Sequence, residues 1–312
     1  MNALVKYFQG FQTILSESTK GLTLNPQESL KSNHGKAQEE EVCLLDSLKS
    51  PHQLNKPSIG CDSLFENINI DEIVNFLRNN GFSLGINLPP CVVKEILEFA
   101  KYTPYYANGN TSLGFYHADK EQAQMKHRKP FFFGNYYNTA LLCSAIRKLE
   151  TDPTLLEIAR QYLQAEPIHQ GNQLWWNFPV DSTISERQRA SQMFYYGSNN
   201  YRLLKFVFYI TDVDLCSSPH VCIQRSHVNK KFSYRFLGRG DSYQELIKYY
   251  GYKNLVPICG KAGSGFVEDT RCFHTETPPG SKERLTLQIE FALKDYSRPN
   301  DIREASQLKC IL

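Results

Sequence analysis

The chain has 312 residues and a formal net charge of +3, from 35 basic and 32 acidic residues. Its hydrophobic fraction of 41% is typical of globular proteins and excludes collagen-like and wholly disordered classes. The charge is too balanced to favour nucleic acid or a membrane surface as a partner, and no apolar run approaches the roughly 20 residues that span a bilayer.

The N-terminal part of the chain differs in composition from the rest. Residues 1–60 are predicted to form a polar extension, with a short amphipathic helix on which Leu4, Phe8, Phe11 and Leu15 share one stripe. A short apolar segment follows, in which Asp71 is expected to N-cap a helix that ends at Gly81. Residues 82–88 alternate like a strand, and Pro89 with Pro90 is expected to begin a second helix.

Helices dominate the first half of the chain and strands dominate the second. Two further helices are predicted at 139–150 and 154–164, and one short helix at 242–250. Strands are predicted at 171–178, 190–197, 203–211, 220–225, 264–269 and 284–293. This order indicates one α+β domain over residues 61–300, with residues 301–312 as a C-terminal tail.

The predicted strand with the clearest alternation runs from Arg284 to Phe291. Its odd-numbered positions are apolar, whereas Arg284, Thr286, Gln288 and Glu290 share the other face. A polar face of this kind is either exposed to solvent or turned into a barrel that holds a polar ligand. In the second case Arg284 would clamp a carboxylate, because its planar guanidinium matches a carboxylate bidentately.

The nine cysteines are scattered, odd in number and without a CxxC pair. This pattern argues against a disulfide framework or a zinc ribbon and favours reduced thiols in a cytoplasmic protein. The N-terminal residues lack the apolar core of a signal peptide.

Two segments carry a resemblance to a known family. The first runs from Phe194-Tyr-Tyr-Gly to Asp214 and continues to Ser226-His227. The second is Gly263-Ser-Gly-Phe-Val-Glu-Asp-Thr-Arg-Cys-Phe-His274, with an Arg ten residues after the His. Together they resemble the phytanoyl-CoA dioxygenase-like family of Fe(II)/2-oxoglutarate-dependent oxygenases over roughly residues 80 to 295.

The resemblance implies a double-stranded β-helix, a jelly-roll barrel of the cupin type with flanking helices. It also implies an iron site of two His and one carboxylate, which leaves positions for 2-oxoglutarate and oxygen. His274 matches the distal His ligand, and Arg284 matches the Arg that holds the far carboxylate of 2-oxoglutarate, with Thr286 beside it. Lys205, Ser226 and His227 also match positions that the family commonly fills alike.

The chain departs from the family at the other two iron ligands. Where the family has a His-x-Asp pair, this chain has Tyr195 and Gly197. One imidazole does not hold Fe(II) well, so His274 alone predicts a non-standard or lost iron site. A replacement site built from His220, His227 and His274 is one alternative. Arg284 is left with a structural alternative as well, an ion pair with Glu268 or Glu290.

Three functions remain open at this point. The favoured one is an oxygenase scaffold that acts on a small molecule in specialised metabolism, with a retained 2-oxoglutarate pocket and with Tyr195, Gly197 and His274 at the catalytic positions. The alternatives are a catalytically dead pseudo-oxygenase that binds a ligand or regulates a partner, and a metal-independent enzyme on the same barrel. Aromatic side chains between residues 102 and 137 either pack in the core or line the substrate pocket.

Overall fold

The computed structural model describes residues 62–128, 130–179, 202–230, 243–276, 281–297 and 300–312. The predicted N-terminal extension and the predicted strand 190–197 lie outside these residues. Among the described residues the helices are α2 (Ile70–Asn80), α3 (Pro90–Tyr102), α4 (Lys120–His127), α5 (Thr139–Leu142), α6 (Ser144–Glu150), α7 (Pro153–Leu163) and α10 (Tyr243–Tyr250). None of them is long and apolar enough to cross a lipid bilayer.

The strands form two antiparallel sheets. They are β1 (Phe82–Leu84), β2 (Tyr105–Ala107), β3 (Gly114–Phe115), β4 (Phe133–Asn135), β5 (Ile168–Asn177), β6 (Leu203–Tyr209), β7 (His220–Ile223), β8 (Leu255–Ile258), β9 (Gly265–Asp269), β10 (His274–Glu276) and β11 (Arg284–Ala292). The large sheet has the order β1-β9-β6-β11-β5-β4-β2-β3, and the small sheet has the order β10-β7-β8. The predicted α+β class is therefore confirmed.

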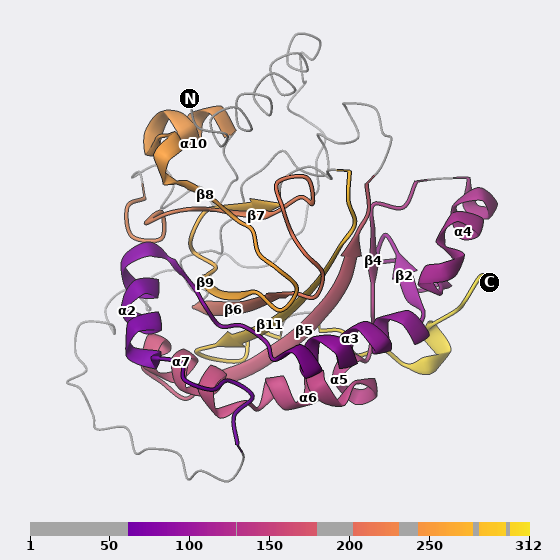
Figure 1. The fold of residues 1–312 in the computed structure, drawn as a ribbon, viewed down its shortest axis with the longest axis horizontal. Helices are drawn as coiled ribbons and strands as arrows, with labels where there is room; N and C mark the ends of the chain where they lie inside the picture. The colour runs from indigo at the N-terminus through magenta and orange to yellow at the C-terminus, as the bar shows by residue number, and fades with distance from the viewer. Residues whose placement is uncertain (1–61, 129, 180–201, 231–242, 277–280, 298–299) are drawn as a thin grey trace, which may run out of the picture. The chain divides into compact units, whose positions relative to one another are not determined.

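Strand β11 lies at the centre of the large sheet, between β5 and β6. Every one of its nine residues is buried. Its apolar side chains Leu285, Leu287, Ile289 and Phe291 belong to the main hydrophobic core, which also contains residues of α2, α3, α6 and α7. Figure 1 shows these helices along one side of the sheet, so they cover its outer face.

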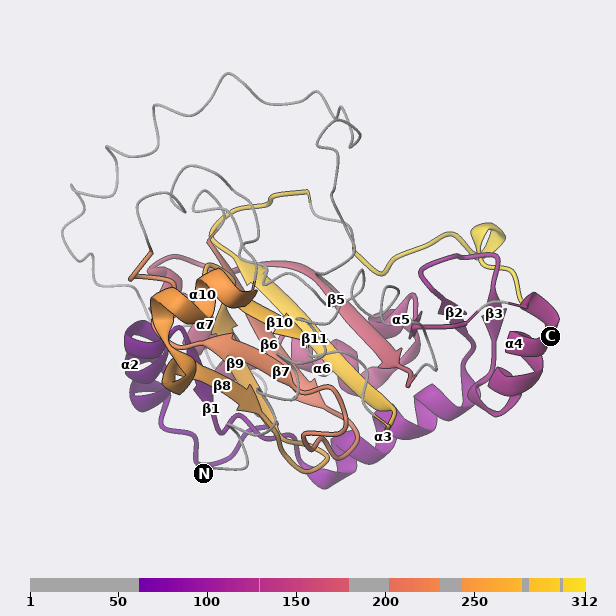
Figure 2. The same cartoon turned by 90° about the horizontal axis from the view of Figure 1, so that it is seen from above.

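The small sheet covers the opposite face of the large one, as the view in Figure 2 shows. A second apolar cluster joins the two sheets; its members include Val207, Tyr209, Cys222 and Phe266. The hydroxyl of Tyr209 on β6 donates to the carbonyl of Ile258 on β8 at 2.8 Å and accepts from the amide of His220 on β7 at 3.1 Å. These bonds fix the distance between the sheets at one point.

The first predicted helix is confirmed, although its N-cap is not the predicted Asp71. Asn69 is the capping residue, because its side chain accepts from the amide of Glu72. Gly81 ends the helix with φ +87°, a left-handed conformation that glycine adopts without strain. The strand predicted at 82–88 is shorter than expected, since only Phe82–Leu84 pair with β9 as a strand.

The helix predicted at 139–150 is two helices that are interrupted at Cys143. Glu95 of α3 accepts hydrogen bonds from the Ser144 hydroxyl and from the Ala145 amide at the start of α6. A side chain from a neighbouring helix therefore starts a new helix within a segment whose pattern is helical throughout. Six short elements were not predicted, namely α4, β2, β3, β4, β8 and β10.

A buried charged network holds the turn between β9 and β10. Asp269 accepts from the guanidinium of Arg271 at 2.6 Å and from the hydroxyl of Tyr162 on α7 at 2.6 Å. Burial by itself would raise the pKa of Asp269, but the contacts with Arg271 and Tyr162 outweigh it, so the pKa lies below its usual value. This network connects α7 to the segment that leads into His274.

We expect Gly81→Ala to destabilise the protein by about 2–4 kcal/mol in chemical denaturation. The new Cβ would lie 2.3 Å from Cys272 Sγ and 2.7 Å from His227 Nδ1, in addition to the strain of a positive φ. Gly85→Ala is the matched control, because Gly85 has φ +96° but no atom within 4 Å of the new Cβ. Its cost should be about 1 kcal/mol, the strain alone. Equal losses in the two variants would contradict the packing argument.

We expect Asp269→Asn to lower the free energy of unfolding by about 3 kcal/mol at pH 7, because it leaves Arg271 half-buried without its carboxylate. Tyr162→Phe, which removes one hydrogen bond, should cost about 1 kcal/mol. Since the pKa of Asp269 is lowered by folding, its contribution is present above the unfolded value of about 4 and is lost as the pH falls through the folded value. The difference in the free energy of unfolding between wild type and Asp269→Asn should therefore shrink in acid. A difference that is independent of pH would refute the contribution assigned to the ionised carboxylate.

Candidate functional site

A cavity of about 260 Å³ lies between the two sheets. Strands of the large sheet supply Gln173, Trp175, Lys205, Val207, Tyr209, Arg284, Thr286 and Gln288, and the small sheet supplies His220, His274 and Thr275. The sequence-predicted residues Lys205, His274, Arg284 and Thr286 thus line one cavity. Tyr195 and Gly197 lie outside the described residues.

The polar face of β11 points into this interior and not to solvent. Arg284 and Thr286 are each 1% exposed, and Gln288 and Glu290 are each 6% exposed. Of the two alternatives left open for this strand, the barrel interior is therefore the correct one. Alternation along a single strand places a row of polar groups along one wall of the cavity.

Arg284 is held at one end of that row. Its Nη2 donates to Asn177 Oδ1 at 2.8 Å, and its Nη1 donates to the carbonyl of Ser218. Asn177 is the register partner of Arg284 on β5, and its Oδ1 also accepts from the indole of Trp175 at 2.8 Å. Both strands and the loop before β7 therefore fix the direction of the guanidinium.

The hydroxyl of Thr286 is buried in the same wall and has no hydrogen-bond partner among the described residues. A buried hydroxyl without a partner costs stability, which a ligand group in the cavity would restore. Thr286 lies two residues from Arg284 on β11, so both side chains face the same space.

Lys205 stands between two carboxylates in the large sheet. In the register it lies opposite Glu290 of β11 on one side and opposite Glu268 of β9 on the other. Its Nζ is 3.8 Å from Glu290 Oε1. Charges of opposite sign therefore alternate across three adjacent strands, which is a favourable cross-strand arrangement.

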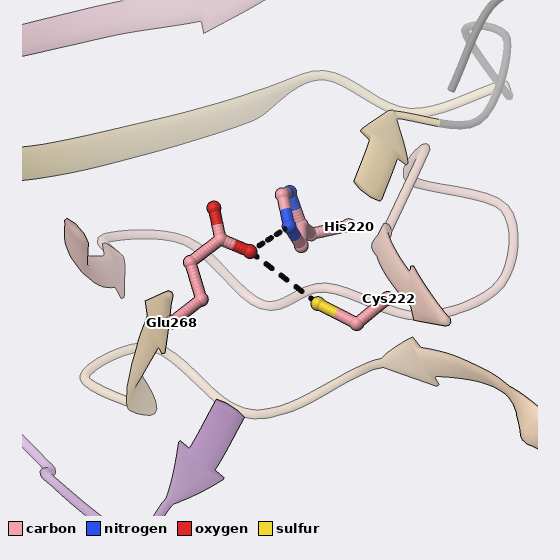
Figure 3. A group of neighbouring side chains, drawn as sticks. All are labelled: His220, Cys222 and Glu268. Atoms are coloured by element: carbon pink, nitrogen blue, oxygen red, sulfur yellow. Dashed lines mark hydrogen bonds and ion pairs between the residues drawn. The ribbon is translucent and has the colours of Figure 1, made fainter. Parts of the chain in front are cut away.

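Glu268 is the residue that sequence reasoning did not assign to the site. It is fully buried, and its Oε2 accepts from His220 Nε2 at 2.7 Å and from the thiol of Cys222 at 3.3 Å (Figure 3). These three side chains form a group whose potential ligand atoms all lie within 4.8 Å of one another. The position of Glu268, directly after the apolar residues Phe266 and Val267 of a predicted strand, is the feature of the sequence that points to a buried charge.

His274 lies beside this group, on the neighbouring strand β10. Its ring stacks on that of His220 with centroids 5.5 Å apart, and its Nε2 lies 4.0 Å from Glu268 Oε1. Its Nδ1 is 2.9 Å from the carbonyl of Cys272. Because a carbonyl only accepts, Nδ1 carries the proton and the lone pair of Nε2 faces the cavity when the ring is neutral.

The charges of the group follow from burial and from its neighbours. Burial lowers the pKa of His274 to about 4, and Lys205 and His220 act in the same direction against Glu268. Burial would raise the pKa of Glu268, but His220, His274 and Lys205 outweigh it and hold the carboxyl ionised. Burial and Glu268 raise the pKa of the Cys222 thiol, so it stays protonated.

The other predicted histidine lies elsewhere. His227 Nε2 is 3.0 Å from the carbonyl of Arg78 at the end of α2, and Ser226 Oγ donates to the carbonyl of Ile223 at 2.7 Å. The structure therefore brings together His220 and His274 of the hypothetical replacement site, but not His227. An ion pair with Glu268 was one structural alternative for Arg284. Glu268 does not form it, because its carboxylate faces His220 and His274.

A second cavity, of about 340 Å³, adjoins the first. The two share Gln173 and Trp175 of β5. Phe133, Tyr136 and Tyr137 also line the second cavity, so part of the aromatic cluster predicted between residues 102 and 137 faces it. Others of that cluster do not, since Tyr105 packs in the main core and Tyr102 is exposed.

Comparisons with known proteins show the fold. No family model and no curated protein matches the chain. Among solved structures, the non-heme alpha-ketoglutarate-dependent carbocyclase SnoK from nogalamycin biosynthesis superposes with a TM-score of 0.51 at 14% identity, covering 75% of this chain and 87% of SnoK. HygX from Streptomyces hygroscopicus, solved with nickel and 2-oxoglutarate bound, gives a TM-score of 0.51 at 12% identity, covering 77% and 94%. The chain thus has the double-stranded β-helix fold of these enzymes, as predicted.

Proposed function

We propose that this protein is a phytanoyl-CoA dioxygenase-like enzyme that binds 2-oxoglutarate in the cavity between its sheets and acts on a small molecule in specialised metabolism. Arg284 binds the far carboxylate of 2-oxoglutarate, with the Thr286 hydroxyl beside it, and Lys205 also lines the cosubstrate cavity. His274 occupies the position of the distal iron ligand. Tyr195 and Gly197 replace the other two family ligands, so any iron site is non-standard.

The observation that carries this proposal is the buried pair Arg284 and Thr286. The guanidinium is oriented by neutral oxygens of Asn177 and Ser218, and it faces a cavity that the hydroxyl of Thr286 also borders. A carboxylate bound there would receive a charge-assisted hydrogen bond from Arg284 and a second one from Thr286. Both residues fit a dicarboxylate, and neither is explained by packing alone.

The residues at the other end of the cavity are suited to an imidazole-bound metal. His274 presents Nε2 toward Glu268, whose Oε1 has no hydrogen-bond partner among the described residues. Iron(II) with 2-oxoglutarate, when bound, would supply the oxidising chemistry. The chain itself positions the cosubstrate by Arg284 and shields the reacting groups within a barrel closed by two sheets.

The substrate is proposed to lie in the second cavity. This cavity adjoins the first through Gln173 and Trp175 and combines aromatic rings with amide side chains. Among the structural neighbours, SnoK is an enzyme of nogalamycin biosynthesis, and HygX has been solved with hygromycin B bound. A small molecule of this general kind is consistent with the size of the second cavity.

A metal-independent enzyme is the second candidate, and the contact between His220 and Glu268 favours it. A carboxylate that accepts from one imidazole nitrogen orients the ring and raises its basicity, which is the arrangement of a general base. A test for iron-dependent turnover separates this candidate and a pseudo-oxygenase from the proposed oxygenase.

We expect Thr286→Val to weaken 2-oxoglutarate binding about tenfold in calorimetry, because it removes one hydrogen bond to the ligand. The same variant should unfold at an equal or higher temperature than wild type, since the hydroxyl it removes has no partner among the described residues. Arg284→Lys, which keeps the charge but loses the planar fork, should weaken binding by at least tenfold. Thr154→Val on α7, outside the cavity, should leave binding unchanged. Unaltered affinity in Thr286→Val and Arg284→Lys would disprove the pocket.

We expect the wild-type protein, supplied with Fe(II), oxygen and 2-oxoglutarate, to convert 2-oxoglutarate to succinate. Succinate formation should fall at least tenfold in His274→Asn and in Arg284→Lys, measured by chromatography of the reaction mixture. Binding of 2-oxoglutarate without any succinate would instead support the pseudo-oxygenase or the metal-independent enzyme.

A further inference from the structure

We propose that the second cavity binds a neutral, polyhydroxylated ring, such as the sugar of a glycoside, which stacks on Trp175 and is hydrogen-bonded by the amide of Asn135. The proposal rests on the proposed function and deepens it, because it names the class of substrate that would lie beside 2-oxoglutarate. The register of three strands and the chemistry of the residues that they present both lead to it.

Strands β4, β5 and β11 place the two cavities side by side on one face of the large sheet. Trp175 of β5 lies opposite Asn135 of β4 on one side and opposite Thr286 of β11 on the other. Residues that are direct partners in a sheet project from the same face, and neighbouring strands are about 4.8 Å apart. A ring held over Asn135 and Trp175 would therefore lie one or two strands away from Thr286 and the proposed cosubstrate.

Trp175 offers such a ring a flat apolar surface. It is half-buried, it borders both cavities, and its indole Nε1 donates to Asn177 Oδ1 at 2.8 Å. This hydrogen bond orients the indole before a ligand binds, which lowers the entropy cost of binding. Phe133 lies two residues from Asn135 on the same face of β4 and adds a second aromatic ring to the lining. A sugar ring has a face of C–H groups, which packs on aromatic side chains of this kind.

The side-chain amides of the cavity suit hydroxyl groups. An amide presents both donors and acceptors, and a hydroxyl group both donates and accepts. The Asn135 side chain borders the cavity and makes no hydrogen bond within the described part of the chain. Gln173 is exposed, and its Oε1 accepts from Gln288 Nε2 at 3.5 Å, which leaves its amide nitrogen for a ligand. A wholly apolar ligand would cover these amides without pairing them, which costs binding free energy.

The two charged residues of the lining are engaged within the protein. Asp301 accepts from the amide of Thr139 at 2.7 Å and also from its hydroxyl. The guanidinium of Arg303 lies over the ring of Tyr137, 4.9 Å from its centroid, and its Nη1 donates to the carbonyl of Asn300 at 2.8 Å. The amides and the aromatic rings therefore dominate recognition, which favours a neutral ligand over an ionised one.

Tryptophan fluorescence reports directly on this cavity, because the chain has two tryptophans. Trp176 lies in the main core, where its indole donates to the hydroxyl of Tyr136 at 3.0 Å. In the full chain with Trp176→Phe, Trp175 is the remaining emitter. The probes are methyl α-glucoside, methyl α-mannoside, methyl β-galactoside, sucrose, maltose and trehalose, with camphor as an apolar and octanoate as an anionic comparison. At least one glycoside should change the emission of Trp175 in a saturable way, whereas camphor and octanoate should not.

Variants measured by saturation-transfer difference NMR locate the bound glycoside. Asn135→Leu, which keeps the size of the side chain but removes its amide, and Trp175→Leu should each weaken binding at least tenfold. Asn75→Ala on α2 and Tyr102→Leu on α3 change an exposed amide and an exposed aromatic ring outside the cavity, so they should leave binding unchanged. Circular dichroism checks that each variant is folded; if Trp175→Leu is not, Asn135→Leu decides by itself.

Failure of every glycoside to bind, tighter binding of camphor or octanoate, or full affinity in Asn135→Leu would each overturn the proposal. Glycoside binding is measured without metal and without 2-oxoglutarate, so its outcome is independent of the cosubstrate pocket. Conversion of 2-oxoglutarate to succinate without glycoside binding refutes the sugar site alone. Glycoside binding without 2-oxoglutarate binding refutes the proposed oxygenase alone.

Discussion

The burial of β11 on both faces is the constraint on which the rest of the molecule depends. A central strand pairs on both edges, so its backbone is satisfied by β5 and β6, and its side chains must find partners above and below. The apolar side chains join the helix-covered core, while Arg284, Thr286 and Gln288 face the small sheet. One strand thus supplies both the stability of the core and a polar wall for the cavity.

The charged side chains that line or adjoin the polar wall need partners of opposite charge or hydrogen bonds in the interior. Arg284 and Lys205 bring two cationic side chains into the interior, and Glu268 and Glu290 bring two acidic ones. A buried charge is tolerated only when it is paired or hydrogen-bonded. Lys205 alternates with the two glutamates across the sheet, and Glu268 is also held by His220. Arg284 lies at the other end of β11, where Asn177 Oδ1 and the carbonyl of Ser218 accept its hydrogen bonds.

Sequence reasoning succeeded where a property belongs to a single element. The alternation of β11 predicted its two faces, Gly81 marked the end of α2, and the pair Pro89-Pro90 marked the start of α3. It failed where a distant side chain intervened. Glu95 divides the helix predicted at 139–150, and no local pattern reveals a cap supplied from about fifty residues away. The short strands β8 and β10 were missed for a related reason, because three or four residues become a strand only when a partner strand is present.

By itself the sequence determined the class of fold and the motif that carries His274 and Arg284, because both depend on residue types at short spacings. It also has Tyr195 and Gly197 at the positions where the resemblance to the oxygenase family predicts a His-x-Asp pair. Only the tertiary structure decided that Glu268 meets His220, and that Lys205, Arg284 and Thr286 share a cavity with His220 and His274. The physical reason is that side chains on one face of a strand have their direction set by alternation along the chain, whereas their neighbours are set by strand order, register and the packing of one sheet on another.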